Sequence, residues 1–171
     1  MLAELRERLL GLGYQFAVRE VAEAAETGED SDAGEKSGAA ETAQAEECAL
    51  HLALRRALSY AQNICSLPEL PEQAGEAGEE VRWPSAWPTI LREPVLDLAA
   101  AYFLQARLAL RPDELAVMPV VTSLRLGDAA LGFAGGSQKT GTDALSRAES
   151  LCNYLLQTAR SAFCGWRGIL W

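Results

Sequence analysis

The sequence predicts a mainly α-helical protein of one domain: a small bundle of about four helices, one β-hairpin or long loop, and an extended C-terminal tail. Three observations lead to this fold class. Apolar residues recur at helical spacing in four segments, a single further segment favours strand, and 171 residues fit one domain of ordinary size. Apolar residues make up 49% of the chain, too large a fraction for a wholly disordered protein.

Two helices are predicted in the first part of the chain, at residues 2–10 and 45–65. In the first, the apolar face is formed by leucines at 2, 5 and 9, and the Gly-Leu-Gly that follows ends the helix because paired glycines lower helix stability. The second carries its apolar stripe on Leu50, Leu54, Leu58, Ala61 and Ile64. The WPSAWP stretch at 83–88 is predicted to be extended or turn-like, because residues before proline avoid the α region.

Two stronger helices are predicted at residues 93–110 and 143–165. Pro94 suits the first turn of one helix, and Asp143 is suited to cap the other. The first has apolar positions at Val95, Leu98, Ala99, Tyr102, Phe103, Ala106 and Leu110. The second has them at Leu145, Ala148, Leu151, Cys152, Leu155 and Ala159. Each stripe predicts that one face of its helix packs on a common core.

The segment at 118–133, between these two helices, favours strand. Gly127 and Asp128 give a turn signal between two short apolar runs, which predicts a β-hairpin or a long loop. The last segment, 160–171, holds bulky apolar residues and two arginines, interrupted by glycines. Two interpretations stay open for it: a last helical turn that packs on its own core, or an apolar, basic tail that docks on a partner.

The acidity of the chain is concentrated in two segments, 26–47 and 69–82, which we interpret as inserts in the single domain 1–171. The whole chain carries 24 Asp+Glu and 15 Lys+Arg, for a net charge of −9. The first insert accounts for −7 and the second for −4, so the remainder is close to neutral at +2. A negative balance argues against a broadly basic surface that coats nucleic acid. Residues 26–43 have almost no large apolar side chain, so we expect a linker there.

The cysteines and the single histidine indicate neither a metal site nor a catalytic site. Cys48 and His51 are one helical turn apart, but zinc normally takes four ligands and no further ligand has a recognisable spacing. A packed cysteine beside a partly exposed histidine is the favoured interpretation. The glycine-rich segment 135–141 lacks the residue order of a phosphate-binding loop, and a hydrolytic triad would need a histidine with an orienting group. We therefore expect no enzyme activity, no cofactor and no metal.

Neither a membrane span nor a signal peptide is expected from the apolar runs. None approaches the roughly 20 residues of a membrane helix. Charged residues also interrupt the N-terminal MLAELRERLL. Four widely spaced cysteines without a CxxC pair fit reduced thiols in a cytosol.

Five motifs follow one another along the chain outside the inserts. They are LGY at 12–14, NICSLPELPE at 63–72, EPVLDLAAAYFL at 93–104, VTSLRLGDAALGF at 121–133, and a C-terminal helix with Arg160, Arg167 and Trp171. This series resembles the head–tail connector (adaptor) proteins of long-tailed bacteriophages and prophages. The most specific part of the resemblance is the S-x-x-x-G-D pattern formed by Ser123, Gly127 and Asp128.

The resemblance implies a small helical subunit that forms a closed ring, typically twelve-fold, beneath the portal at the capsid vertex. Such a ring extends the DNA channel and offers a platform to the next connector or tail-completion protein. The expected partners are other copies of this chain, the portal protein, that next protein, and DNA that passes through the lumen without sequence-specific binding. The protein would be made in the bacterial host cytoplasm and would reside in the neck of the virion, with no membrane partner.

The resemblance and the residue pattern together nominate eight residues for assembly contacts. They are Ser123, Arg125, Gly127 and Asp128 in the hairpin, and Phe163, Trp166, Arg167 and Trp171 in the tail. The sequence departs from the family pattern at Ala129 and Ala130, where the family prefers threonine and another polar residue. Both acidic inserts and the WPSAWP stretch are also additional to that pattern.

Two alternatives to a connector stay open. One is a DNA-packaging accessory, similar to the small helical terminase subunits, which would need a basic face and would bind DNA in a salt-dependent way. The other is an unrelated helical enzyme or regulator, which a bound metal or ligand would indicate.

Overall fold

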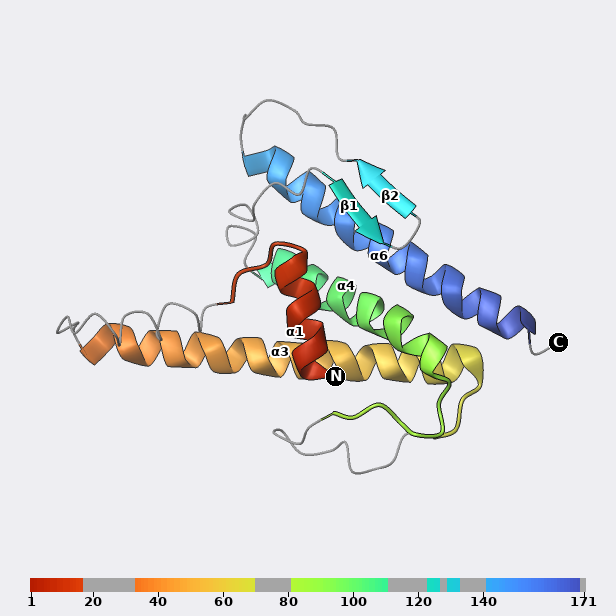
Figure 1. Cartoon of the computed structure of the whole chain (residues 1–171). Helices are drawn as coiled ribbons and strands as arrows, with labels where there is room; N and C mark the ends of the chain where they lie inside the picture. The colour runs from red at the N-terminus through yellow and green to blue at the C-terminus, as the bar shows by residue number, and fades with distance from the viewer. Residues whose placement is uncertain (17–32, 70–80, 111–122, 127–128, 133–140, 170–171) are drawn as a thin grey trace.

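In the computed structural model, the described residues form a bundle of four α-helices, one of which is surrounded by the other three (Figure 1). The structure describes residues 1–16, 33–69, 81–110, 123–126, 129–132 and 141–169. The elements in these ranges are α1 (Leu2–Gly11), α3 (Ala33–Cys65), the 3₁₀ helix η1 (Thr89–Leu91), α4 (Arg92–Leu110), β1 (Ser123–Leu126), β2 (Ala129–Gly132) and α6 (Gly141–Ile169). The mainly helical class predicted from the sequence is confirmed. None of the described helices is long and apolar enough to cross a membrane.

The central element is α4, which packs against α1, α3 and α6 and is preceded directly by η1. Every residue from Val95 to Ala101 is buried, because helices cover α4 on several sides and not along one stripe. The three alanines at 99–101 are fully buried and let the neighbouring helices approach closely. The predicted apolar stripe fails near the end of the helix: Ala106 is exposed, and Arg107 occupies the buried face in its place.

Helix α1 ends in a turn that directs Tyr14 into the core. Gly13 has φ 87°, and its N–H donates to the carbonyl of Leu10 while the N–H of Tyr14 donates to the carbonyl of Leu9. These two hydrogen bonds form a Schellman motif, in which glycine is favoured because it adopts positive φ without steric cost. Leu9 and Tyr14 are both buried, which is the apolar contact that accompanies this motif.

Helix α3 begins far earlier than predicted, at Ala33 and not near residue 45. The linker predicted at 26–43 is therefore wrong from residue 33 onward. Composition indicated that this segment could not bury apolar surface, but a helix already nucleated by packed turns can extend without burial. Alanine and glutamate, which dominate these turns, are strong helix formers. At the other end, Ser66 has φ 51° and the N–H of Leu67 donates to the carbonyl of Gln62, which closes the helix before Pro68.

Helix α6 continues to Ile169, so the extended C-terminal tail predicted from the sequence is wrong as far as that residue. The glycine at 165 does not break the helix. A glycine in a helix interior costs about 1 kcal/mol, whereas burying a phenylalanine side chain contributes roughly 1.5–3 kcal/mol. Phe163 is fully buried and lies against Tyr60 of α3, with ring centroids 5.9 Å apart. The packing of this side chain holds the last turns of α6 on the bundle.

The WPSAWP segment forms a turn that covers the end of α3. The indole N–H of Trp87 donates to the carbonyl of Pro68 at 3.0 Å, and that of Trp83 donates to the carbonyl of Trp87 at 3.3 Å. The two rings meet edge to face at 5.6 Å, and Trp87 is buried in the core. These tryptophans therefore close the core at one end of the bundle.

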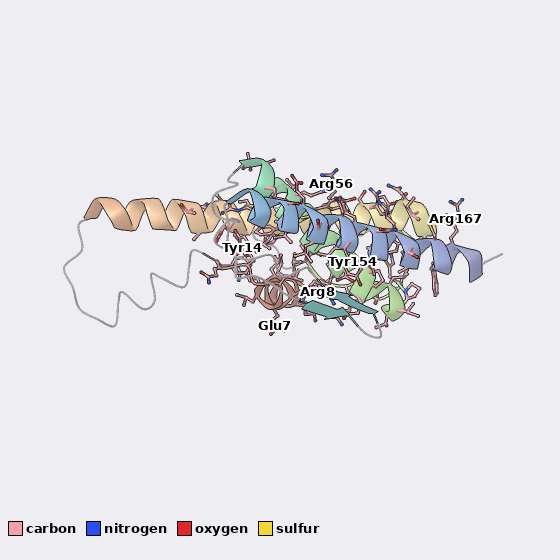
Figure 2. The ribbon with its side chains drawn as sticks, turned by 90° about the horizontal axis from the view of Figure 1, so that it is seen from above. Glu7, Arg8, Tyr14, Arg56, Tyr154 and Arg167 are labelled. Carbon is pink, nitrogen blue, oxygen red and sulfur yellow. The ribbon has the colours of Figure 1, made fainter. Side chains whose placement is uncertain are left out.

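Strands β1 and β2 pair in antiparallel register, with Ser123 opposite Gly132 and Leu126 opposite Ala129. They form a two-stranded sheet, and no third strand pairs with it among the described residues. In both views this pair lies on the same side of the bundle as α1 (Figures 1 and 2). Gly127 and Asp128, the predicted turn residues, lie outside the described part of the chain.

The contrast between two leucines of α4 tests the central position of this helix. Leu104 is 1% exposed and Leu110 is 77% exposed. We expect Leu104→Ala to lower the free energy of unfolding by about 2–5 kcal/mol, because it removes buried methyl groups and leaves a cavity. The same substitution at Leu110, with the same change in helix propensity, should cost less than about 0.5 kcal/mol. Urea denaturation of both variants measures the difference, and equal losses would contradict the central burial of α4.

Candidate functional site

The eight residues nominated for assembly do not form one described surface. Ser123 and Arg125 occupy alternate positions of β1, for which the structure describes the backbone path. Phe163 belongs to the core and is unavailable to a partner. Trp166 packs against that core, and Arg167 beside it is exposed. Trp171, like Gly127 and Asp128, lies outside the described residues.

Of the three nominated tail residues that the structure describes, Arg167 is exposed, Trp166 is half-buried and Phe163 is buried. The interpretation of the segment as a helical turn that packs on its own core is correct for Phe163. The ring nitrogen of Trp166 is buried and has no hydrogen-bond partner within the described residues. An indole N–H usually finds an acceptor when it is buried, so this group is an exception among the tryptophans of the described chain.

The last residues of the first acidic insert, Glu46 and Glu47, take part in packing and ion pairs. Glu46 is 3% exposed; its Oε1 accepts a hydrogen bond from the hydroxyl of Tyr14 at 2.8 Å and lies 3.2 Å from Nη2 of Arg107. Arg107 is buried as well, so a charged pair connects α3 with α4 in the interior. Glu47 pairs with Arg6 of α1 nearer the surface.

A second ionic group joins α1 to α4. Arg8 donates to the Oδ1 of Asp97 at 2.7 Å and to the backbone carbonyl of Glu93 at 3.2 Å, and it also pairs with the Glu93 carboxylate. Arg92 pairs with Glu4 through two of its nitrogens. A shallow depression between the two helices is lined by Glu4, Glu7, Arg8, Arg92, Glu93 and Leu96. Because its two arginines are already paired with carboxylates, this depression has little charge left to offer a ligand.

Burial raises the pKa of Asp97 to about 6, from its ordinary value of 3.8. The Arg8 guanidinium acts in the opposite direction, and the Glu93 carboxylate adds a further rise. Loss of hydration therefore outweighs the ion pair at this carboxyl, which is a common balance for a charge placed inside a core.

The cysteines and His51 form no reactive pair in the described part of the chain. Cys48 is exposed, which corrects the packed cysteine expected there, because residue 48 falls on the outward face of α3. Burial lowers the pKa of His51, and the nearby guanidinium of Arg55 lowers it further. Burial raises the pKa of Cys152 to about 12, so this thiol stays protonated. Within the described residues, no group of three or more His, Cys, Asp or Glu side chains could hold a metal ion.

A face rich in arginine remains after these pairs are assigned. Residues 48–65 of α3 and 150–169 of α6 contain no Asp or Glu, and they carry Arg56, Arg160 and Arg167, all exposed. Figure 2 shows Arg56 and Arg167 on one side of the bundle and Glu7 on the opposite side. The Arg56 guanidinium lies over the ring of Tyr102 at 4.3 Å, a cation–π contact that holds it between α3 and α4. We call Arg56, Arg160 and Arg167 the arginine face.

Sequence reasoning missed the buried charges of the core: Glu46, Asp97 and Arg107. A signal was present for Asp97, which interrupts an apolar run from Val95 to Leu104. A lone charge inside such a run predicts a buried, paired group, because an unpaired one would be costly. Glu46 had no such signal, since it follows a stretch of small and acidic residues and precedes another glutamate.

The structure predicts very different roles for the adjacent glutamates 46 and 47. We expect Glu46→Ala to lower the free energy of unfolding by about 3–5 kcal/mol, because it takes this carboxylate from a buried arginine. Glu47→Ala should cost at most about 1 kcal/mol, because its pair is exposed to solvent. Both substitutions change the same helix, so intrinsic propensity cancels in the comparison. Urea titrations that give equal losses would contradict a structural role for the inner pair.

The raised pKa of Asp97 predicts a dependence of stability on pH. The folded chain binds a proton at this carboxyl below pH about 6, whereas the unfolded chain binds it only near the ordinary pKa of 3.8. The contribution of Asp97 therefore stabilises the fold as pH falls from 7 to 4, by about 3 kcal/mol at a conversion of about 1.4 kcal/mol per pKa unit. Asp97→Asn removes this contribution, and its amide oxygen can still accept from Arg8.

Denaturation of both proteins at pH 7.5 and pH 4.5 measures the effect. At pH 7.5 the variant should have a larger free energy of unfolding than the wild type, and at pH 4.5 this difference should disappear. An equal difference between the two proteins at both values would contradict the assignment.

Comparison with protein-family models, with curated proteins and with solved structures finds no match to this chain. The resemblance to head–tail connectors therefore stays a prediction that rests on the motifs quoted above.

Proposed function

We propose that this protein is a virion structural subunit, a head–tail adaptor that forms a ring between the portal and the tail or next connector and extends the DNA channel. The observation that carries the proposal is the order of the motifs. LGY follows α1, and NICSLPELPE includes the last residues of α3. EPVLDLAAAYFL lies in the first turns of α4, and the S-x-x-x-G-D segment begins at β1. The last motif, which holds Arg160 and Arg167, coincides with the end of α6.

Two structural features are compatible with an assembly role. A two-stranded sheet leaves one edge of each strand without a partner strand in the described chain, and open edges are suited to contacts between proteins. Buried polar pairs and a closed core occupy the interior, while the exposed charged groups lie on the helix surfaces. In the proposed ring, the strand pair and the end of α6 contact neighbouring subunits and the portal.

Electron microscopy of the purified chain with portal-containing capsids tests this function. We expect a ring coaxial with the portal. Salt-dependent DNA binding by the free protein, without attachment to capsids, would favour the DNA-packaging accessory instead. Absence of any ring on the portal would overturn the proposal.

The burial of Phe163 changes how the role of the C-terminus can be tested. Removing residues 163–171 would take a core side chain away, so loss of portal attachment could reflect unfolding. A chain that ends at residue 167 and carries Arg167→Gln keeps Phe163 and Trp166. We expect it to retain a free energy of unfolding within about 1 kcal/mol of the wild type, because it changes only an exposed charge and residues beyond it. Its attachment to portal-containing capsids should fall at least about tenfold, because arginine is enriched among the few residues that carry most of the affinity of an interface.

Circular dichroism and urea denaturation provide the control for folding, and co-sedimentation with capsids measures attachment. Undiminished attachment of this variant would show that the end of α6 does not dock on the portal.

A further inference from the structure

The arginine face spans two neighbouring helices, α3 and α6, which run in the same direction (Figure 1). Tyr60 and Phe163, whose ring centroids are 5.9 Å apart, fix the alignment of the two helices. Arg56 comes one turn before Tyr60 on α3. Arg160 comes about one turn before Phe163 on α6, so the two arginines lie at nearly the same level. Arg167 lies two turns beyond Arg160 on the same face of α6, about 10 Å along the axis.

The arginine face is a basic surface in an acidic chain. Residues 48–65 and 150–169 hold four arginines and no Asp or Glu, so the rest of the chain carries a net charge of −13. The three arginines of the face are exposed, and none of them forms an ion pair within the described residues. A partner that carries several negative charges is therefore the complement of this face.

Exposed apolar side chains adjoin the arginine face where α3 passes α4. These two helices run in opposite directions (Figure 1), and the Arg56 guanidinium lies 4.3 Å from the ring centre of Tyr102. Leu52, which is 69% exposed, comes one turn before Arg56 on the same face of α3. Ala106, also exposed, comes one turn after Tyr102 on α4, so it lies at about the level of Leu52. We call the arginine face together with Leu52, Tyr102 and Ala106 the docking face.

Duplex DNA is a poor match for this mixture of side chains. Affinity for DNA grows with the number of phosphates neutralised, and the docking face offers three exposed arginines. The net charge of −9 also opposes the approach of a polyanion at long range. An exposed leucine gains nothing from a phosphate backbone, whereas arginine beside aromatic and apolar side chains is typical of contacts between proteins.

A second copy of this chain offers few unpaired carboxylates to the docking face within the described residues. On the opposite side of the bundle, Glu4 pairs with Arg92. The Glu93 carboxylate pairs with Arg8. Glu7 is exposed on that side and adds a single charge (Figure 2). A different protein, with several carboxylates free to pair, is the better match.

We infer that the docking face binds an acidic, partly apolar surface of another protein. Carboxylates of that surface pair with the guanidinium groups, whose planar fork suits bidentate contacts, and its apolar side chains cover Leu52 and Ala106. The cation–π contact with Tyr102 holds Arg56 in place before binding, so less side-chain entropy is lost on association. Naming the portal protein as this partner in the neck rests on the proposed function.

A synthetic peptide tests the chemistry of the docking face without any phage component. The probe is an amphipathic peptide of three heptads, about 20 residues, that contains only leucine and glutamate. Two matched peptides carry glutamine in place of glutamate, or serine in place of leucine. We expect the purified chain to bind the leucine–glutamate peptide and to bind each matched peptide at least about tenfold more weakly, because each lacks one half of the complementary chemistry. Fluorescence anisotropy of the labelled peptides measures the dissociation constants.

Variants with matched net charge locate the ionic part of the contact. Replacing all three arginines of the face (Arg56→Gln, Arg160→Gln, Arg167→Gln) should weaken binding of the leucine–glutamate peptide at least about tenfold. The control lowers the net charge by the same three units at exposed positions of the turn at 83–88 and of η1: Ser85→Glu, Ala86→Glu and Thr89→Glu. The control should bind like the wild type. Circular dichroism confirms that both variants are folded.

A second pair of variants tests the apolar part of the contact. Leu52 and Ile90 are 69% and 70% exposed, so neither side chain is needed by the core. Leu52→Ser should weaken binding of the peptide at least about threefold, because it removes apolar surface from the contact. Ile90→Ser, in η1 before α4, should leave the dissociation constant unchanged.

Three results would overturn the inference. The first is a wild type that does not bind the leucine–glutamate peptide, or a triple glutamine variant that binds it equally well. The second is displacement of the peptide by duplex DNA that the triple glutamine variant no longer binds, which would assign the face to nucleic acid. The third is self-association of the wild type that the same variant loses, since a second copy would then be the occupant. Analytical ultracentrifugation measures this last property.

Portal-containing capsids separate the docking face from the proposed function. We expect the triple glutamine variant and Leu52→Ser to co-sediment with capsids more weakly than the wild type, and both control variants to attach normally. A wild type that binds the peptide but not the capsids would contradict the proposed function alone. Undiminished attachment of the triple glutamine variant would overturn the docking face as the contact with the portal and would leave the proposed function intact.

Discussion

The burial of α4 is the constraint on which the rest of the structure depends. Seven successive residues, Val95 to Ala101, are buried, so no single partner helix can cover them. An amphipathic helix needs one neighbour, whereas a helix that is apolar on most sides has to be surrounded. Helices α1, α3 and α6 meet this requirement from different directions, and the tryptophan turn at 83–88 closes one end. The bundle is therefore organised around α4.

Charged residues of α4 connect this central helix to its neighbours. Asp97 pairs with Arg8 of α1, and Arg107 pairs with Glu46 of α3. Burying a charge is costly, and such a pair adds little net stability compared with well-packed apolar residues. Its effect is instead selective, because a shift of α1 or α3 by one turn would separate the partners and leave a charge buried without that pair. We therefore interpret these pairs as fixing how α1 and α3 dock on α4, while apolar packing supplies most of the stability.

The acidic residues of the first insert have different structural roles. The sequence places the acidity in two inserts on a domain that is otherwise close to neutral. The structure divides the first insert: Glu46 and Glu47 take part in packing and ion pairs, and residues 33–45 continue α3 beyond the bundle.

The sequence by itself determined the helical class, the positions of the four helices to within several residues at most ends, and the apolar stripe of α3. Leu50, Leu54, Leu58 and Ala61 are all buried, as their spacing predicted. Local periodicity was sufficient there because each residue needs one neighbouring surface. The sequence could not show that Phe163 belongs to the core and not to a docking tail, since both roles require the same apolar side chain.

Only the tertiary structure decided which charged residues pair when the two partners are distant in the chain. Glu46 is 61 residues from Arg107, and Arg8 is 89 residues from Asp97, so no local pattern links either pair. The same holds for the first turns of α3, where composition indicated a linker but the packed turns that follow extend the helix. Periodicity reports which face of an element is apolar. Three-dimensional packing sets which element covers this face and which charged residue pairs with a buried charge.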